Sequence, residues 1–366
     1  MFKNFVIERF RGLQHCELQD LRRVTLLTGK NNVGKTAVLE AMFVHCGNYN
    51  PNLLMVANAL RGMTTMSVNN TQQYRGQPWK CYFFDYDESK PIRLNAEMTL
   101  GQKGSEQIGI TLTAVSNSTE LSQLSGQFRL PLARAGAFGA PSVLKLELSR
   151  GVKGRSAAKH YLMFDDKQAI VHPPPPQADH LGRLLLSTTR ENPRELADHF
   201  AKLQMLGKVD VLVKALQPLE PRLLSLELVF DGEPIIHGDI GLAKRRLIPL
   251  PMMGDGLNRV TQLLLAIAQC SGGFVFVDDI DTGLHYSVMK DVWLSIFQAA
   301  VDFDTQVIAT THSAECAEAA SEAASSSERV DSFALARLER TGTRLRTVGY
   351  SSDELRQAFE TNMEVR

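Results

Sequence analysis

The stretch Gly29-Lys30-Asn31-Asn32-Val33-Gly34-Lys35-Thr36 decides the fold class, because it matches the pattern G-x-x-x-x-G-K-[ST] in full. The apolar run Val24-Thr25-Leu26-Leu27 precedes it, and Thr36 to Cys46 follows with apolar side chains at helical spacing. In this strand–loop–helix order, successive backbone N–H groups curl around an anionic phosphate chain, and the helix N-terminus adds its partial positive charge. We therefore predict phosphate contacts from Gly29, Asn31, Asn32, Val33, Gly34, Lys35, Thr36 and Ala37.

Two residues of this loop have specific predicted roles. We expect Lys35 to reach the β- and γ-phosphates of a nucleotide and the Thr36 hydroxyl to bind Mg²⁺. Far downstream, the apolar run Phe274 to Val277 ends in Asp278 and Asp279, as a Walker B element does. Because Mg²⁺ takes oxygen ligands, we predict that Asp278 holds the ion directly or through water and that Asp279 orients or deprotonates the attacking water.

Two further segments have the composition of nucleotide-binding loops. A third expected strand, Thr305 to Ala309, leads into Thr310-Thr311-His312-Ser313, where His312 could sense the γ-phosphate or be an ordinary loop histidine. The segment Met253 to Arg259 places Gly254, Asp255 and Gly256 directly before a predicted helix, Val260 to Gln269. A helix N-terminus of this kind is a second phosphate site, which a second subunit could use.

The rest of the chain divides into segments with different hydrophobic patterns. Residues 1–13 alternate as a strand does, and short alternating runs between 91 and 172 indicate antiparallel strands that end before four prolines, 173–176. Residues 181–223 are helical in pattern, with one helix opened by Asn192-Pro193. From 256 onward the pattern is helix, strand, helix, strand, helix, typical of a parallel sheet, and the tail predicts a hairpin and a short helix near Ser352.

Composition excludes several classes of protein. The 366 residues carry 40 basic and 40 acidic side chains, so the formal net charge is zero and binding to nucleic acid or membrane by overall charge is excluded. The five scattered cysteines form no C-x-x-C pair, which predicts reduced thiols and a cytoplasmic protein. The N-terminus is not that of a signal peptide, and the uncharged run Val260 to Val277 is broken by two glycines, so no membrane partner is expected.

Taken together, these motifs resemble those of the ABC-type ATPases of the SMC, RecF and OLD branch, and especially the compact stand-alone bacterial ATPases labelled AAA that have no Toprim nuclease domain. The resemblance rests on Phe10-Arg11-Gly12, on Gly29 to Thr36, on Pro251 to Arg259, on Val277 to His285 and on Ala309 to Ser313. It implies an α/β fold, an ABC-ATPase head of the P-loop NTPase class with a mixed sheet, an antiparallel β insert and a helical subdomain.

The resemblance also implies an organisation of the chain. Residues 1–90 would form the N-terminal half of the head, 91–178 the antiparallel β insert, 179–252 a helical lobe, and 253–366 the C-terminal half with the signature, Walker B and switch-histidine elements. Two heads would sandwich two ATP molecules with Mg²⁺. The helices are too short for a coiled-coil arm and too few residues follow Ser313 for a nuclease domain, so any effector is expected to be a separate protein.

Residue roles carry over from the family position by position. Gly254-Asp255-Gly256 would be the signature loop that contacts the nucleotide of the other subunit, His312 the switch histidine, and Asp281 to His285 the loop that crosses the dimer interface. Arg11 would lie near the nucleotide. The Q-loop glutamine has five candidates: Gln72, Gln73, Gln77, Gln102 and Gln107.

Two departures from the family pattern bear on activity. Asp279 replaces the usual glutamate, which sets the base about 1.5 Å further back and predicts slow turnover. Gly254 replaces a frequent serine, so backbone N–H groups and Arg259 would supply the missing contact across the dimer.

Three functions remain open. The first is an ATPase homodimer that regulates a separate effector, as in bacterial anti-phage defence. The second is a RecF-like ATPase of DNA repair. Local basic groups favour this function, such as Lys244-Arg245-Arg246 and Arg22-Arg23. The third is a nucleotide-gated scaffold with very slow hydrolysis. ATP is favoured over GTP, because the chain has no N-K-x-D-type base-reading motif.

Overall fold

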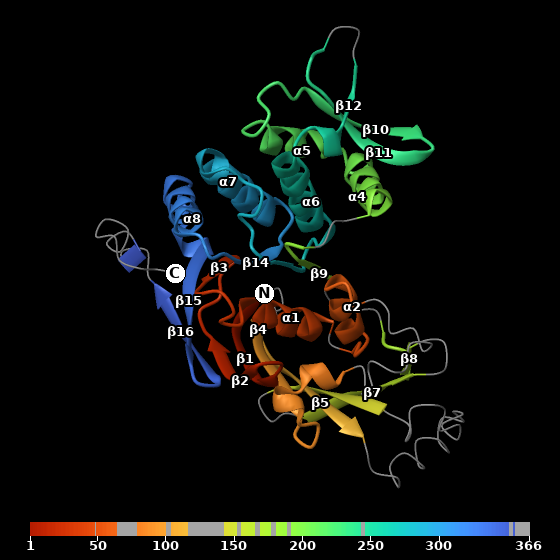
Figure 1. Ribbon diagram of the computed structural model, residues 1–366, viewed down its shortest axis with the longest axis vertical. Helices are drawn as coiled ribbons and strands as arrows, with labels where there is room; N and C mark the ends of the chain where they lie inside the picture. The colour runs from red at the N-terminus through yellow and green to blue at the C-terminus, as the bar shows by residue number, and fades with distance from the viewer. Residues whose placement is uncertain are drawn as a thin grey trace. The chain divides into compact units, whose positions relative to one another are not determined.

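The computed structural model describes residues 1–47, 49–63, 79–99, 104–115, 143–151, 155–164, 169–176, 181–188, 192–242, 246–350 and 354–355. The chain forms two compact units (Figure 1). Unit 1 comprises Met1–Asp20, Asn32–His180 and Glu339–Thr347, and unit 2 comprises Leu21–Asn31, Leu181–Leu338 and Val348–Arg366.

Unit 1 is built on antiparallel strands. In chain order these are β1 (Phe2–Phe10), β2 (Leu13–Leu18), β4 (Ile92–Thr99), β5 (Ser105–Val115), β6 (Val143–Arg150), β7 (Arg155–Phe164) and β8 (Ala169–His172). Their order across the sheet is β8-β7-β6-β5-β4-β1-β2. The first part of β16 (Arg344–Tyr350) adds to β2 in parallel, with Arg344 opposite His15. The antiparallel strands of 91–172 thus continue the sheet of β1, because β4 pairs with it.

The described residues of unit 1 include the helices α1 (Lys35–Cys46) and α2 (Leu53–Leu60) and the 3₁₀ turns η1 (Lys80–Tyr82) and η2 (Phe84–Tyr86). Helix α1 is buried along most of its length and contacts β1 and β4. Its last turn brings the His45 ring edge-on to Phe2 and Phe5, with centroids 5.5 and 5.2 Å apart. The alternation of buried and partly exposed residues along β1 supplies this aromatic core.

Unit 2 contains a parallel sheet in the order β15-β3-β14-β13-β9. Its strands are β3 (Val24–Thr28), β9 (Gly182–Leu185), β13 (Phe274–Val277), β14 (Gln306–Thr310) and the first part of β15 (Phe333–Thr341). Every residue of β3, β13 and β14 is buried. Continuous apolar strands of this kind are expected where helices cover both faces of a parallel sheet.

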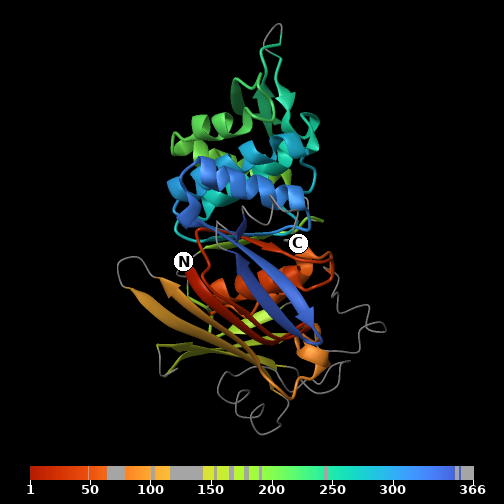
Figure 2. The ribbon, with the colours of Figure 1, turned by 90° about the vertical axis from the view of Figure 1, so that its left-hand side faces the viewer.

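The helices of unit 2 are α4 (Pro193–Met205), α5 (Val209–Leu216), α6 (Asp255–Gln269), α7 (Tyr286–Asp302) and α8 (Ala314–Ser326), and the short turns are η4 (Leu250–Met252) and η5 (Val330–Ser332). Helices α6, α7 and α8 lie beside one another (Figure 2). The predicted start of α4 is confirmed, because the Asn192 side chain caps it by accepting the Arg194 N–H at 3.0 Å. No helix among the residues described is long and apolar enough to span a bilayer.

The structure differs from the sequence expectations at three places. Residues 182–185 form strand β9 rather than helix, because they pair in parallel with β13. The segment expected to be a helical lobe also holds a three-stranded antiparallel sheet, β10 (Ser225–Asp231), β11 (Glu233–Asp239) and β12 (Ile248–Pro249). The single N-terminal strand predicted is followed by a second, β2. The helix expected near Ser352 lies almost wholly outside the described residues.

Candidate active site

Three neighbouring parallel strands of unit 2 deliver the predicted site residues to one edge of the sheet. In the register, Leu27 of β3 lies opposite Thr310 of β14, and Ala309 of β14 lies opposite Val277 of β13. The three strands therefore end together, at Thr28, Thr310 and Val277. The loops that follow begin with Gly29, Thr311 and Asp278, so the entrance to the phosphate loop lies at the same edge as the Walker B carboxylates (Figure 1).

A threonine hydroxyl fixes the two Walker B aspartates. Thr310 is fully buried, and its Oγ1 donates to Asp278 Oδ1 at 2.8 Å. The same oxygen accepts the backbone N–H of Asp279 at 2.9 Å. Asp278 is 8% exposed, so its carboxylate is held in place with little solvent around it. Sequence reasoning gave no role to Thr310, although it lies directly before the predicted histidine loop.

Asp279 and His312 lie side by side. The distance from His312 Nδ1 to Asp279 Oδ1 is 3.6 Å, and the side chains are 52% and 31% exposed respectively. Asp279 has φ 44°, a left-handed conformation that costs a non-glycine residue free energy and is common at functional sites. A partly exposed carboxylate beside an imidazole can orient a water molecule and accept its proton.

Arg259 connects helix α6 to this loop. Its Nη2 donates to the carbonyl oxygens of Asp278 and Asp279 at 3.1 and 3.0 Å. Burial lowers the pKa of Arg259, while the carboxylates of Asp279, Asp281 and Asp278 raise it. The sequence analysis assigned Arg259 to a nucleotide contact across a dimer, whereas here its guanidinium contacts the Walker B loop of its own chain.

The predicted signature loop surrounds the start of α6. Gly254 has φ 104° and precedes the first residue of the helix, Asp255, and both are exposed. A Cβ at Gly256 would lie 2.9 Å from the carbonyl oxygen of Gly283, so only glycine fits there. The loop from Asp281 is tied to β14 in turn, because Thr311 Oγ1 donates to Asp281 Oδ1 at 2.6 Å.

The remainder of the phosphate loop lies in unit 1. Gly34 has φ 120° and precedes α1, whose first two residues are Lys35, 7% exposed, and Thr36. A Cβ at Gly34 would lie 2.9 Å from Leu13 Cδ2, which explains the second glycine of the motif. Arg340 donates from Nε to the Val33 carbonyl at 3.3 Å. Sequence reasoning missed Arg340, because nothing in the local pattern links the tail to the loop.

Arg11, also predicted to lie near the nucleotide, belongs to unit 1. Its Nε lies 2.5 Å from Glu40 Oε2, and its guanidinium carbon lies 4.2 Å from the centre of the Tyr82 ring. Of the five candidates for the Q-loop glutamine, only Gln107 is among the residues described, in β5. The other four fall outside them.

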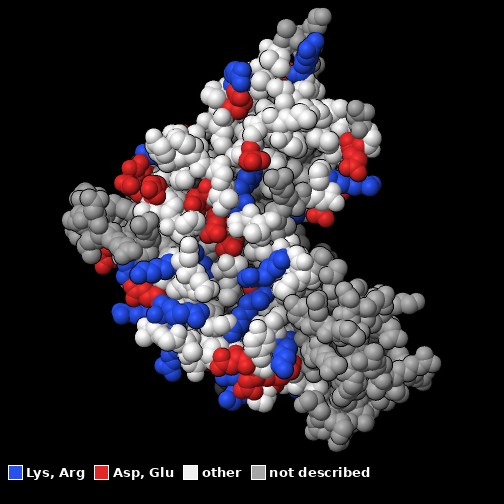
Figure 3. Space-filling model, viewed as in Figure 1, with Lys and Arg blue, Asp and Glu red and all other residues white. Residues whose placement is uncertain are grey.

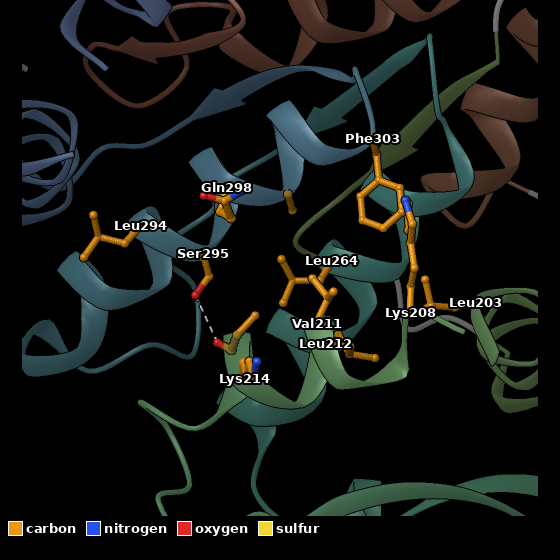
Figure 4. Close-up of a pocket in the computed structure, with 13 residues that line it drawn as sticks. Leu203, Lys208, Val211, Leu212, Lys214, Leu264, Leu294, Ser295, Gln298 and Phe303 are labelled. Carbon is orange, nitrogen blue, oxygen red and sulfur yellow. Dashed lines mark hydrogen bonds between the residues drawn. The ribbon is translucent and has the colours of Figure 1, made fainter. Parts of the chain in front are cut away.

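Unit 2 also contains a cavity that is lined mainly by apolar side chains, unlike the charged site at the ends of β3, β14 and β13. It measures about 320 Å³ and lies between α5, α6 and α7, with Leu212, Leu264 and Phe303 among its lining residues (Figure 4). Lys208 Nζ lies 4.5 Å from the centre of the Phe303 ring, and Ser295 Oγ donates to the Ala215 carbonyl. Phe303 lies three residues before the first residue of β14, so the cavity lies at the other end of the strands from Asp278.

Known proteins that are similar to this chain over most of its length include the following two. One is a protein of Helicobacter pylori (strain ATCC 700392 / 26695) called ATP/GTP phosphatase, which is 20% identical over 344 residues, or 87% of each chain. The other is the crystal structure of an SMC head bound to the C-winged helix domain of ScpA, with a TM-score of 0.50 and 12% identity over 98% of this chain and 99% of that one. The structural likeness confirms the predicted α/β fold of an ABC-type ATPase head.

A family comparison covers residues 125–316, just over half of the chain. The matched segment contains the predicted signature loop, Asp278, Asp279 and His312. With the phosphate loop upstream, these residues complete the motif set of an ATPase of the AAA and ABC type. The chain therefore belongs to the family described as "AAA domain, putative AbiEii toxin, Type IV TA system".

Proposed function

We propose that this protein is a Mg²⁺-dependent ATPase of the cytoplasm that closes into a homodimer around two ATP molecules and thereby regulates a separately encoded effector in anti-phage defence. The observation that carries the proposal is the common strand edge of β3, β14 and β13. There, Asp278 is fixed by Thr310, and Asp279 lies 3.6 Å from His312. A buried carboxylate and a partly exposed one at the end of a phosphate-loop sheet are the groups that phosphoryl transfer requires for the metal ion and for the attacking water.

Each residue would have one task. Lys35 and the backbone N–H groups of Asn31 to Thr36 would bind the phosphates, and Arg11 would contact them as well. The Thr36 hydroxyl and the Asp278 carboxylate are oxygen donors, the kind that Mg²⁺ prefers, and would hold the ion that neutralises developing charge on the phosphates. Asp279 would orient the attacking water and accept its proton, with His312 beside it.

Phosphate release tests the base assignment. We expect Asp279→Asn to lower the hydrolysis rate about 10²-fold or more while ATP binding is retained, because general bases contribute roughly this much. Asp304→Asn is the matched control, since Asp304 belongs to the same unit but is an exposed partner of Arg23, 2.8 Å away. Equal rates for the two variants would refute the assignment. Chelation of Mg²⁺ with EDTA should also abolish hydrolysis.

The short side chain of Asp279 separates a regulatory ATPase from a scaffold that barely hydrolyses ATP. Replacement by glutamate brings the carboxylate about 1.5 Å further forward. If Asp279→Glu hydrolyses ATP faster than the wild type, the short side chain of Asp279 limits the natural rate, and the scaffold function is favoured. If it hydrolyses ATP more slowly, the loop geometry is adapted to aspartate.

Exposure of the signature loop supports the dimer. Gly254 and Asp255 are exposed, no atom approaches within 4 Å of a Cβ at Gly254, and the adjacent Met252 is 79% exposed. We expect Asp279→Asn to sediment as a dimer with ATP and Mg²⁺, and as a monomer with ADP. A Gly254→Glu change in that background would place a carboxylate against the phosphates of the partner's nucleotide and should abolish the dimer.

A separate effector agrees with the family description, because a toxin–antitoxin system has two components. Expression of this chain together with its neighbouring reading frame should reduce plaque counts in a phage-sensitive host. Either protein alone, or the pair with Lys35→Ala, should leave the counts unchanged. Protection that persists with Lys35→Ala would refute regulation by nucleotide.

Basic side chains on β6 and β7 are paired with acidic ones, which favours this function over DNA binding. Lys145 and Lys159 both pair with Glu147, at 3.6 and 3.0 Å, and Arg150 pairs with Glu106 at 3.6 Å. On the face shown in Figure 3, basic and acidic side chains lie beside one another. Lys244 and Arg245 lie outside the described residues. A gel shift that weakens steeply with rising salt would restore the RecF-like alternative.

A further inference from the structure

A buried ion cluster in unit 1 has one carboxylate and two guanidinium groups. Glu40, on helix α1, has a side chain that is 0% exposed. Its Oε2 lies 2.5 Å from Arg11 Nε, and its Oε1 accepts from Arg61 Nε at 2.5 Å. The Arg11 and Arg61 side chains are 15% and 35% exposed. One carboxylate is thus shared by two guanidinium groups.

Arg11 also keeps a donor that nothing in the described residues accepts. Its Nη2 and Nε are both buried and have no hydrogen-bond partner there, although Nε lies at ion-pair distance from Glu40 and Nη2 does not. A buried donor without an acceptor is unfavourable, and one on a guanidinium more so than a neutral one. An anion with oxygen acceptors would satisfy this nitrogen.

The orientation of Arg11 is set from three sides. Its guanidinium carbon lies 4.2 Å from the centre of the Tyr82 ring, a cation–π contact. The Tyr82 hydroxyl is in turn 2.5 Å from the Leu54 carbonyl oxygen and 2.8 Å from Asn58 Oδ1. The Arg11 backbone has φ 51°, and its N–H donates to the Tyr82 carbonyl at 2.6 Å. This strained, over-determined conformation is typical of a functional arginine.

The cluster adjoins the phosphate loop along α1. Glu40 follows Thr36 by four residues, so both side chains lie on one face of the helix, about 6 Å apart along its axis. The carboxylate that pairs with Arg11 therefore belongs to a residue one helical turn from Thr36, whose hydroxyl is predicted to bind Mg²⁺. Arg11 reaches this position from the turn between β1 and β2.

We propose that Glu40 is a positioning residue for Arg11: its carboxylate forms an ion pair on the Nε side of the Arg11 guanidinium and so presents Nη2 to an oxygen of the terminal phosphate of the bound nucleotide. Arg61 shares the same carboxylate and keeps Glu40 from neutralising Arg11 completely, while the Tyr82 ring fixes the plane of the guanidinium. The site thereby distinguishes a triphosphate from a diphosphate. This inference rests on the proposed function, because it requires that the loop binds ATP.

The test compares the affinities for ATP and ADP, measured by calorimetry with Mg²⁺ in the Asp279→Asn background, which prevents turnover. Glu40→Asp retains the charge but draws the carboxylate back by about 1.5 Å, so it cannot hold both arginines. We expect Glu40→Asp and Arg11→Ala each to lower the preference for ATP over ADP about tenfold or more, the size of one charge-assisted hydrogen bond. The double variant should lower it no further than Arg11→Ala does, because Glu40 acts through Arg11.

The control is Glu97→Asp, the same substitution in unit 1 at a carboxylate that accepts from Asn4 Nδ2 at 2.7 Å and does not belong to the cluster. It should leave the ATP preference unchanged, and a urea midpoint for each variant shows that the fold is retained. Effects of Glu40→Asp and Arg11→Ala that multiply in the double variant would overturn the positioning role, as would an unchanged preference in either single variant. Absence of ATP binding in the parent protein would refute the proposed function instead.

Discussion

Substitution of Thr310 by valine removes one hydroxyl and keeps the shape of the side chain. In the structure that hydroxyl donates to Asp278 Oδ1 at 2.8 Å and accepts the Asp279 N–H at 2.9 Å, in a position that is 0% exposed. A hydrogen bond to a charged group contributes about 1.5–3 kcal/mol, and an orphaned buried N–H costs about 1–3 kcal/mol. We therefore expect unit 2 to lose about 3 kcal/mol of unfolding free energy.

Thr25→Val is the matched control on the neighbouring strand β3. Thr25 is also 0% exposed, but its Oγ1 bonds only the neutral backbone of Arg22, accepting at 3.0 Å and donating at 3.3 Å. We expect it to cost about 1 kcal/mol. Urea unfolding followed by the fluorescence of Trp293, with Trp79 changed to phenylalanine, reports on unit 2 alone, because these are the chain's two tryptophans.

The same substitution should affect catalysis. Without the hydroxyl, the Asp279 N–H has no acceptor to hold the residue at φ 44°, and a displacement of about 1 Å can cost about 10²-fold in rate. We expect phosphate release to fall by roughly that factor for Thr310→Val and to stay near wild type for Thr25→Val. Costs for the two valine variants within about 0.5 kcal/mol of each other, or equal hydrolysis rates, would refute the reasoning.

Three further outcomes follow from single contacts. Gly34→Ala should abolish ATP binding measured by calorimetry, because its Cβ would lie 2.9 Å from Leu13 Cδ2 at φ 120°, and retained affinity would contradict this. Burial lowers the pKa of His45 from 6.5 to about 4, so between these pH values the folded state binds fewer protons than the unfolded state. About 3 kcal/mol of unfolding free energy, fully present above pH 6.5, should therefore be lost as the pH falls to 4. Urea unfolding at a series of pH values measures this loss, and a His45→Gln variant whose unfolding free energy depends on pH in the same way would exclude the histidine as its cause. Arg259→Gln should slow phosphate release about tenfold or more with little effect on ATP affinity, because Asp279 loses a contact at 3.0 Å, and a purely affinity-based loss would contradict this.

Much of the fold follows from local patterns. The run Phe274 to Val277 is apolar at every position, and β13 is buried at every position, as a central parallel strand must be. Asn192-Pro193 predicted the start of α4, because a cap and a first-turn proline act on adjacent backbone groups. Gly182 to Leu185 carries no such signal. Its leucines fit a helix equally well, and only pairing with β13 makes it a strand.

Some residues of the candidate site could be predicted from the sequence, and others only from the structure. The residues of the phosphate loop and the Walker B aspartates could be named from spacing, because those motifs constrain contiguous backbone. Glu40 could not be distinguished from any acidic residue of a helix until two arginines were found on its carboxylate. Arg340, which holds the Val33 carbonyl, lies 307 positions from it in the chain.

The sequence by itself determined that the chain has the strand–loop–helix unit of a phosphate-binding ATPase, since glycine conformations and apolar periodicity act over a few residues. Tertiary structure decided which side chains hold the predicted catalytic groups. Thr310 and Asp278 are 32 positions apart and meet only because their strands are neighbours in parallel register. Arg11 and Glu40 meet because α1 packs against β1. Contacts of this kind depend on the packing of whole elements, which no local pattern encodes.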